Sequence, residues 1–195
     1  MRNSRDATPV LIACEDGRLE LVKILAEGGA DVGVKDDNFH TPLFVASRDG
    51  HRDVVGYLLQ LGCVDVDDGV YFGMSPLAAA CAEGHMDVVK LLVEEGGADV
   101  DLEGKYRNGP LYHACRGGFG TMVALLVKKG AWSRASKDED GGVWVRGLSV
   151  AARCGHVDVV RMLVGGGSGG GWSGYEWKHT IESCQLEWTC ESCGG

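Results

Sequence analysis

Five times along its length, the chain returns to the same pattern of residues. The segments TPVLIACEDGRLELVKILAEGGADV from Thr8, TPLFVASRDGHRDVVGYLLQLGCVDVD from Thr41 and SPLAAACAEGHMDVVKLLVEEGGADVD from Ser75 are close copies of one another. Two weaker copies start at Gly109 and Arg146, so that successive starts lie 33, 34, 34 and 37 residues apart. A repeat of this period predicts a stack of small units, because no single unit could bury its apolar face alone.

Three positions hold the same residue type in all five units. The alanines are Ala13, Ala46, Ala80, Ala114 and Ala151, the glycines are Gly17, Gly50, Gly84, Gly118 and Gly155, and the leucines are Leu25, Leu58, Leu92, Leu126 and Leu163. Thr or Ser followed by Pro favours the start of a first helix, since the hydroxyl caps it and Pro presets φ. The glycine favours a left-handed turn that ends this helix. Segments such as HMDVVKLLV then predict an amphipathic second helix, and GGADV leads into an extended loop.

This pattern, TPL..AA..GH.DVV..LL..GADV, resembles the ankyrin repeat over roughly residues 3–164. The resemblance implies an all-α solenoid of paired antiparallel helices with β-turn fingers at right angles to them. It also implies a protein-interaction scaffold that binds a partner protein through a concave face of finger tips and first-helix side chains. We therefore divide the chain into an ankyrin-repeat domain (1–164), a Gly/Ser linker (165–171) and a flexible tail that contains Cys and Trp (172–195).

The chain departs from the family pattern in several places. The family has a histidine three residues after the unit start; the residues there are Leu11, Phe44, Ala78, Tyr112 and Ser149. Units 4 and 5 lack the Thr and unit 5 also lacks the Pro, so we expect these units to be looser or shaped by something bound. No polar capping repeat follows the fifth unit. Either the tail covers that end, or the chain is a regulatory fragment of a larger multidomain protein.

Composition excludes several classes of partner. A hydrophobic content of 45% suits a packed core, and a net charge of −9 argues against a nucleic-acid partner, which needs a basic face. No apolar run approaches the roughly 20 residues of a membrane span, and the N-terminus lacks the apolar core of a signal peptide. We therefore expect a cytoplasmic protein, with the nucleus as the alternative, and no membrane partner.

Aromatic residues and methionine gather where the family places its finger tips. The candidate partner-binding residues are His40, Tyr71, Phe72, Met74, Tyr106, Tyr112 and Trp144. Such side chains are favoured at binding hot spots and are unusual at exposed loop tips. The alternative is that some of them fold back and fill the space left by the absent histidine. A charged rim on the first helices, or simply a solvated face, is formed by Arg48, Asp49, Glu83, Arg116 and Arg153.

Cysteines and histidines recur at fixed repeat positions. Cys14, Cys81 and Cys115 each follow the repeat alanine, and we expect them to be small core residues. Neighbouring helices lie roughly 8–10 Å apart, whereas a disulfide needs Cα atoms closer than about 7 Å. We therefore expect no disulfide between equivalent cysteines of neighbouring units. His51, His85 and His156 follow the turn glycine, and the resemblance implies that they brace the turn between the two helices of a unit. They do not converge, so we expect no metal or catalytic role for them.

The tail contains His179, Cys184, Cys190 and Cys193. Only one Cys-x2-Cys pair is present, so a zinc module is an alternative rather than the expectation. A flexible tail, or a hairpin that lays Trp177 and Trp188 over the last unit, are the other interpretations. No Walker loop, G-x-S-x-G, H-E-x-x-H or dinucleotide fingerprint is present. We therefore expect no enzyme, no cofactor, no bound metal and no small-molecule substrate.

Overall fold

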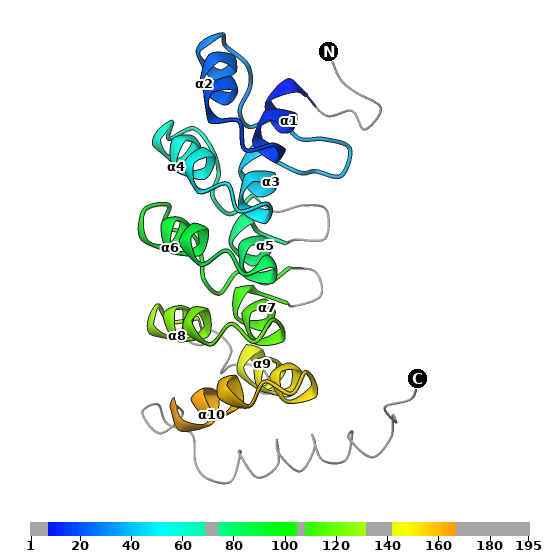
Figure 1. Ribbon diagram of the computed structural model, residues 1–195, viewed down its shortest axis with the longest axis vertical. Coiled ribbons are helices and arrows are strands. Elements are labelled where there is room, and N and C mark those ends of the chain that lie inside the picture. The colour runs from blue at the N-terminus through cyan, green and yellow to red at the C-terminus, as the bar shows by residue number, and fades with distance from the viewer. Residues whose placement is uncertain (1–7, 69–73, 105–107, 132–141, 167–195) are drawn as a thin grey trace.

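The chain forms an elongated stack of helical hairpins in the computed structural model (Figure 1). The structure describes residues 8–68, 74–104, 108–131 and 142–166, with only the backbone described for 142–145, 165 and 166. The first helices of units 1 to 5 are α1 (Pro9–Glu15), α3 (Pro42–Arg48), α5 (Pro76–Glu83), α7 (Pro110–Arg116) and α9 (Gly142–Arg153). The second helices are α2 (Leu19–Glu27), α4 (Arg52–Gln60), α6 (Met86–Glu94), α8 (Gly120–Lys128) and α10 (Val157–Gly166).

First and second helices form two parallel layers, and the loop between units 1 and 2 projects beside the first helices (Figure 1). The described residues contain no β-strand. The all-α ankyrin solenoid predicted from the repeats is therefore confirmed. Within the same residues, no helix is long and apolar enough to span a membrane.

The first helices of units 1 to 3 begin as the sequence predicts. The side-chain oxygens of Thr8, Thr41 and Ser75 accept hydrogen bonds from the backbone amides three residues later, at 3.4, 3.1 and 3.2 Å. Each cap satisfies one of the amides that a helix N-terminus leaves free, and the proline that follows needs no amide partner. In unit 4, Gly109 makes no side-chain cap, but Pro110 still begins α7.

Unit 5 differs from the predicted start at Arg146. Its first helix, α9, begins at Gly142 and is 12 residues long, whereas α7 has 7 residues. The proline at which each of the other first helices begins is replaced here by Gly147, so the helix extends toward the N-terminus. Trp144, predicted at a finger tip, accordingly lies in the first turn of α9; its side chain is not among those described.

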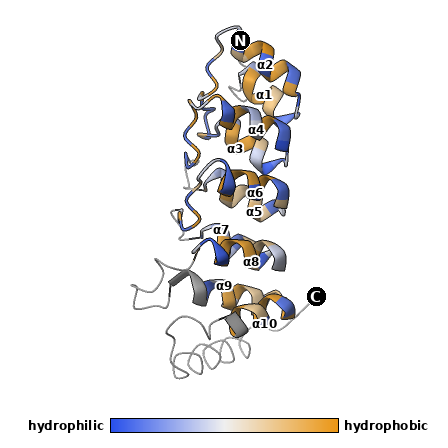
Figure 2. Ribbon diagram, turned by 90° about the vertical axis from the view of Figure 1, so that its left-hand side faces the viewer, coloured by the Kyte–Doolittle hydropathy of each residue, from blue (hydrophilic) through white to orange (hydrophobic). Residues whose placement is uncertain are grey.

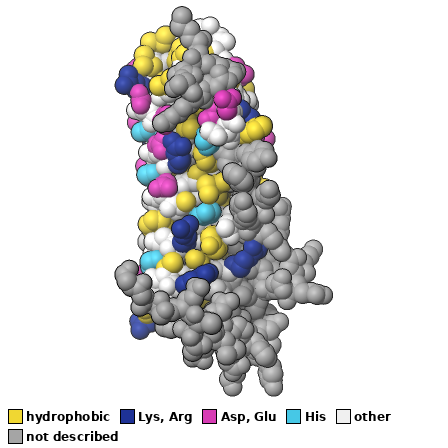
Figure 3. Space-filling view, turned by 90° about the vertical axis from the view of Figure 1, so that its right-hand side faces the viewer, with side chains coloured by type: hydrophobic (Ala, Val, Ile, Leu, Met, Phe, Trp, Pro, Cys, Tyr) yellow, Lys and Arg dark blue, Asp and Glu magenta, His cyan; other side chains and the backbone are white. Residues whose placement is uncertain are grey.

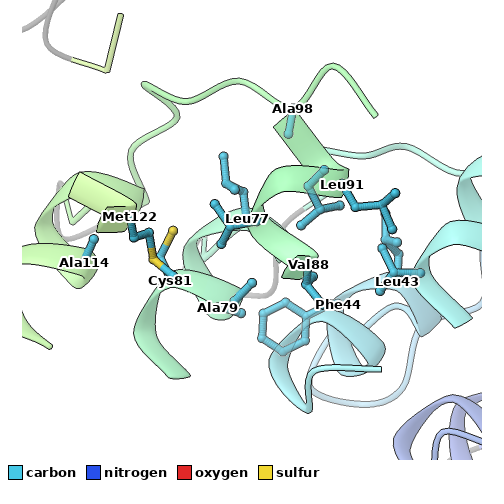
Figure 4. Close-up of a cluster of buried hydrophobic side chains, with 14 of the residues drawn as sticks. Leu43, Phe44, Leu77, Ala79, Cys81, Val88, Leu91, Ala98, Ala114 and Met122 are labelled. Carbon is cyan, nitrogen blue, oxygen red and sulfur yellow. The ribbon is translucent and has the colours of Figure 1, made fainter. Parts of the chain in front are cut away.

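A continuous core runs between the two helix layers. The repeat leucines from Leu58 to Leu163 are at most 1% exposed, and the repeat alanines are at most 3% exposed. Figure 2, which views the stack from the second-helix side, shows apolar residues in every helix pair. Side chains from α3, α5, α6, α7 and α8 meet in one cluster (Figure 4). Because the core crosses unit boundaries, each unit depends on its neighbours for burial.

The predicted core cysteines are buried. Cys14, Cys81 and Cys115 have no exposed surface, and all three are free thiols. Burial raises the pKa of Cys14 and of Cys115 to about 12 and raises the pKa of Cys81 as well. A thiolate is the reactive form of cysteine, so these thiols are packing residues and poor nucleophiles.

The histidines after the turn glycine fasten one unit to the unit before it. His51 Nε2 lies 2.8 Å from the carbonyl oxygen of Glu15, and His156 Nε2 lies 3.0 Å from that of Arg116. Each imidazole nitrogen donates to its carbonyl, which can only accept. In unit 4 the equivalent residue is Phe119, whose ring packs against Gly84 of unit 3. The expected bracing of the turn within a unit is thus a contact between units.

Candidate protein-binding face

One side of the stack is formed by the first helices and the loops that lead into them. We number positions from the unit starts, so that Thr8, Thr41, Ser75, Gly109 and Arg146 are position 0. We call positions +7 and +8, together with Tyr112, the first-helix face. Its members are Glu15, Asp16, Arg48, Asp49, Ala82, Glu83, Arg116, Gly117, Arg153 and Cys154. Figure 3 views the molecule from this side.

The first-helix face is acidic over units 1 to 3. Arg48 is held by Asp49 through two hydrogen bonds, Nε to Oδ1 at 2.8 Å and Nη2 to Oδ2 at 2.7 Å. The same guanidinium lies 3.5 Å from Glu15. The charge of Arg48 is therefore neutralised by Asp49, and Asp16 pairs with Arg18 at 3.1 Å. Glu15 and Glu83 leave this half with negative charge.

The face becomes basic over units 4 and 5. Arg116 and Arg153 are exposed at position +7, and Gly117 and Cys154 replace the acidic residue at position +8. Within the described part of the chain, neither arginine forms an ion pair. In Figure 3 the acidic side chains lie in the upper half of the face, and Lys and Arg side chains occur in both halves. A ligand that crosses this face meets a change of sign along the stack.

Tyr112 and His113 lie beside the basic half of the face. The Tyr112 ring is half-buried and meets the His113 ring edge-on, with centroids 5.5 Å apart at 88°. His113 is 7% exposed, at a position occupied by Val45, Ala79 and Val150 in units 2, 3 and 5. Burial, and to a lesser degree the charge of Arg116, lower the pKa of His113. The neutral form is therefore favoured, and α7 presents an aromatic pair one turn before an arginine.

Two predicted finger residues lie against the protein. His40 donates its backbone amide to Asp36 Oδ1 at 2.8 Å, and its Nδ1 lies 2.8 Å from Asp36 Oδ2. Its ring also stacks on Phe44, with centroids 5.1 Å apart. Phe44 occupies the position of the absent family histidine, so His40 follows the fold-back alternative. Met74 is half-buried and packs against the core in the same way.

The His40 contacts also determine the ionisation of Asp36. Partial burial alone would raise the pKa of this carboxyl. The hydrogen bonds from the amide and ring of His40 outweigh that effect, and the pKa of Asp36 lies below its ordinary value. This ionised cap closes the loop before unit 2.

The other predicted residues are placed differently. Tyr112 is half-buried against the core and belongs to the first-helix face. Tyr71, Phe72 and Tyr106 lie outside the described residues, as does the tail with His179, Cys184, Cys190 and Cys193. Partner binding by the finger residues therefore stays a prediction.

Neighbouring loops contact each other directly. Lys35 Nζ lies 2.7 Å from Asp68 Oδ1, and the backbone amide of Asp99 donates to Asp67 at 3.0 Å. Burial is the largest cause that raises the pKa of Asp67, and the charges of Asp99 and Asp65 add to it. No group of three His, Cys, Asp or Glu side chains within the described ranges could hold a metal ion. These carboxylates organise the loops.

His113 was missed as a buried neighbour of Tyr112 when the sequence was considered alone. Its only signal is a histidine at a repeat position that carries an aliphatic side chain in the other units. That signal indicates an unusual core residue but does not say that Tyr112 and Arg116 share its helix face.

Comparison with known proteins agrees with this architecture. A sequence model described as "Ankyrin repeats (3 copies)" matches residues 1–69 and 61–139. The chain belongs to the ankyrin repeat family. The mouse "Protein phosphatase 1 regulatory subunit 27" is 46% identical over 46 residues, which are 24% of this chain and 30% of that protein. The "Notch-regulated ankyrin repeat-containing protein" of Xenopus tropicalis is 43% identical over 44 residues, 23% of this chain and 39% of the relative.

A third relative shows how widely the repeat is distributed. The rat "Ankyrin repeat and SAM domain-containing protein 6" is 40% identical over 62 residues, 31% of this chain and 7% of that protein. The chain thus spans less than half the length of each of these relatives. Ankyrin repeats are generally protein-interaction modules, and nothing in the comparisons indicates catalysis.

Proposed function

We propose that this chain is a protein-interaction module that binds a partner protein along its first-helix face. The observation that carries the proposal is the change of sign along this face. Glu15, Asp16 and Glu83 lie over units 1 to 3, and Arg116 and Arg153 lie over units 4 and 5. Charges arranged in this way select partners and set their register more than they add affinity.

The stack presents these side chains on a prearranged scaffold. They lie at the ends of helices whose positions are set by a shared core and by contacts between units, such as that of His156 with Arg116. Binding to a prearranged surface requires little ordering of the backbone, so less of the interaction free energy is lost. Tyr112 and Arg116 belong to the residue types that dominate binding energy.

The names of the relatives support a non-catalytic role. One matched protein is called a regulatory subunit of a phosphatase, which is a protein that acts through another protein. We extend only that general role to this chain: a partner protein, no cofactor and no small-molecule substrate. The finger residues Tyr71, Phe72 and Tyr106 remain candidate additions to the same face.

Charge reversal tests the proposal. The variant Arg116→Glu/Arg153→Glu alters the basic half of the face. The control Lys90→Glu/Lys128→Glu makes the same change in net charge at exposed sites on α6 and α8, the second-helix layer. Both should match the wild type in circular dichroism and melting, because all four side chains are exposed.

The readout is quantitative affinity capture from a native lysate, followed by mass spectrometry. We expect proteins that are captured by the wild type and by the lysine control but lost from the arginine variant. If both variants capture the same proteins as the wild type, the basic half of the first-helix face is not the binding site. A Tyr71→Ala/Phe72→Ala/Tyr106→Ala variant then asks whether the fingers are.

A further inference from the structure

The arginine at position +7 of unit 2 binds two carboxylates of its own chain. Arg48 donates Nε and Nη2 to the two carboxylate oxygens of Asp49 at 2.8 and 2.7 Å, a paired contact that suits the planar guanidinium. Glu15, at position +7 of unit 1, lies 3.5 Å from the same guanidinium. Hydrogen bonding to Asp49 is the largest cause that raises the pKa of Arg48. An arginine at this position is therefore placed to bind carboxylates.

Units 4 and 5 repeat this arginine without the carboxylate that follows it in unit 2. Arg116 and Arg153 are exposed at position +7, and the residues after them are Gly117 and Cys154 instead of an equivalent of Asp49. Among the described residues, no carboxylate pairs with either arginine. The N–H donors that Asp49 occupies in unit 2 therefore remain accessible to a ligand in units 4 and 5.

The stack sets the separation of the two arginines. Their helices, α7 and α9, pack against each other as the first helices of neighbouring units. Packed helices lie roughly 8–10 Å apart. His156 of unit 5 also donates to the carbonyl oxygen of Arg116 at 3.0 Å, which fastens unit 5 to the end of α7. A ligand that pairs with Arg116 and Arg153 together must present two carboxylates about one unit apart.

An α-helix presents side chains at this spacing. Seven residues advance a helix by about 10.5 Å and almost two full turns, so residues i and i+7 lie on the same face. Residues i and i+4 are only about 6 Å apart along the axis. In an extended strand, side chains on one face recur every second residue, at about 6.7 Å or about 13 Å. A helix with a heptad spacing of carboxylates therefore fits the two arginines better than a strand does.

We propose that the basic half of the first-helix face binds an acidic helical segment of the partner protein, with carboxylates seven residues apart on Arg116 and Arg153. This inference rests on the proposed function and names the chemistry of the partner. Glu83 is exposed one unit before Arg116. It would repel a third carboxylate at the preceding heptad position and attract a lysine there. The order of charges thus sets the direction in which the segment lies along the stack.

The test uses labelled peptides of known sequence and the full-length chain. Binding is measured by fluorescence anisotropy at low ionic strength, where exposed charges are screened least. The probe is an alanine-rich helical peptide with lysine, glutamate and glutamate at three successive heptad positions. One control has the same composition with its glutamates four residues apart. A second control is a proline-rich peptide with glutamates three residues apart, about 9.3 Å in a polyproline II helix.

We expect the heptad probe to bind about tenfold more tightly than either control, because only the probe is helical and also reaches both arginines. Absence of binding to the heptad probe overturns the proposal. Equal affinity for the control with glutamates four residues apart overturns the heptad spacing, and equal affinity for the proline-rich control overturns the helical conformation.

Charge reversal locates the contact on the chain. Arg116→Glu/Arg153→Glu should abolish binding of the heptad probe. Lys90→Glu/Lys128→Glu, which makes the same change in net charge on the second-helix layer, should leave most of the affinity. Binding that persists undiminished in the arginine variant overturns the proposal.

A carboxylate added within the chain should compete with the probe. Cys154→Asp places a carboxylate directly after Arg153, as Asp49 follows Arg48, and should weaken binding several-fold. Cys154→Asn is its neutral control, and Thr121→Asp adds the same charge at an exposed site on α8. Both controls should bind like the wild type. Equal affinities for Cys154→Asp and Cys154→Asn contradict the role given to Arg153.

The experiments separate this inference from the proposed function. If the heptad probe fails to bind while Arg116→Glu/Arg153→Glu still loses captured lysate proteins, the partner chemistry is wrong and the interaction module stands. Sedimentation velocity of the chain alone, at the same ionic strength, should show a monomer. A dimer that Arg116→Glu/Arg153→Glu dissociates would make the acidic half of a second copy the occupant and overturn the proposed partner.

Discussion

Gly50 allows the contact between units to be measured as a free energy. It adopts a left-handed backbone with φ +79°, and a Cβ placed there would lie 2.5 Å from Nδ1 and 2.6 Å from Cε1 of His85. Substitution by alanine therefore introduces backbone strain and also displaces the His85 ring of the next unit. Gly62 lies in the same unit with φ +65°, and a Cβ there would meet nothing within 4 Å. Gly62→Ala introduces strain alone.

The two effects predict different losses. A left-handed residue with a side chain costs about 1–2 kcal/mol, which is the whole expected loss in the free energy of unfolding for Gly62→Ala. Forcing a methyl group into a packed site adds about 1–3 kcal/mol. Gly50→Ala should therefore lower the free energy of unfolding by about 2–5 kcal/mol. The difference between the variants measures how tightly unit 3 is packed on unit 2.

Urea unfolding followed by circular dichroism supplies the measurement. The substitution His85→Ala removes the ring. In that background Gly50→Ala should lower the free energy of unfolding by no more than Gly62→Ala does. The difference between the effects of Gly50→Ala with and without the His85 ring is the coupling energy of the two residues. Equal losses for the two glycine variants in the wild-type background would refute the packing argument. So would a Gly50→Ala loss that persists undiminished without the His85 ring.

Three further outcomes are expected. Thr41→Ala should lower the free energy of unfolding by about 1 kcal/mol, because the cap to the Phe44 amide is lost, and Thr41→Ser should restore most of it in the same urea titration. Because burial lowers the pKa of His113, the unfolded state binds a proton on this side chain before the folded state does as the pH falls. The free energy of unfolding should therefore decline below about pH 6.5 in the wild type and decline less in His113→Val. Urea midpoints at pH 5 to 8 supply the measurement. In site-resolved maleimide labelling of the native protein, the exposed thiols of Cys63 and Cys154 should react quickly. The buried thiols of Cys14, Cys81 and Cys115 should react slowly. Equal labelling rates at all five would contradict this expectation.

The sequence by itself determined the unit. The Thr-Pro pairs, the turn glycines and the spacing of apolar residues act over a few neighbouring positions, through caps, left-handed turns and amphipathic faces. Such features can be recognised without knowing where any other unit lies. The helix starts at Pro9, Pro42 and Pro76 and the burial of Cys14 and Cys81 accordingly match the prediction.

Tertiary structure decided what depends on the stacking of units. The contact of His51 with Glu15 is such a property, because its two residues lie 36 positions apart and belong to different units. The exposure of Ile24 is another such property: Ile24 is 63% exposed and Leu91, the equivalent residue of unit 3, is 6% exposed, although both are aliphatic. Local hydrogen bonding can be inferred from spacing along a chain, whereas burial depends on which surfaces meet, and that is settled only when the units are stacked.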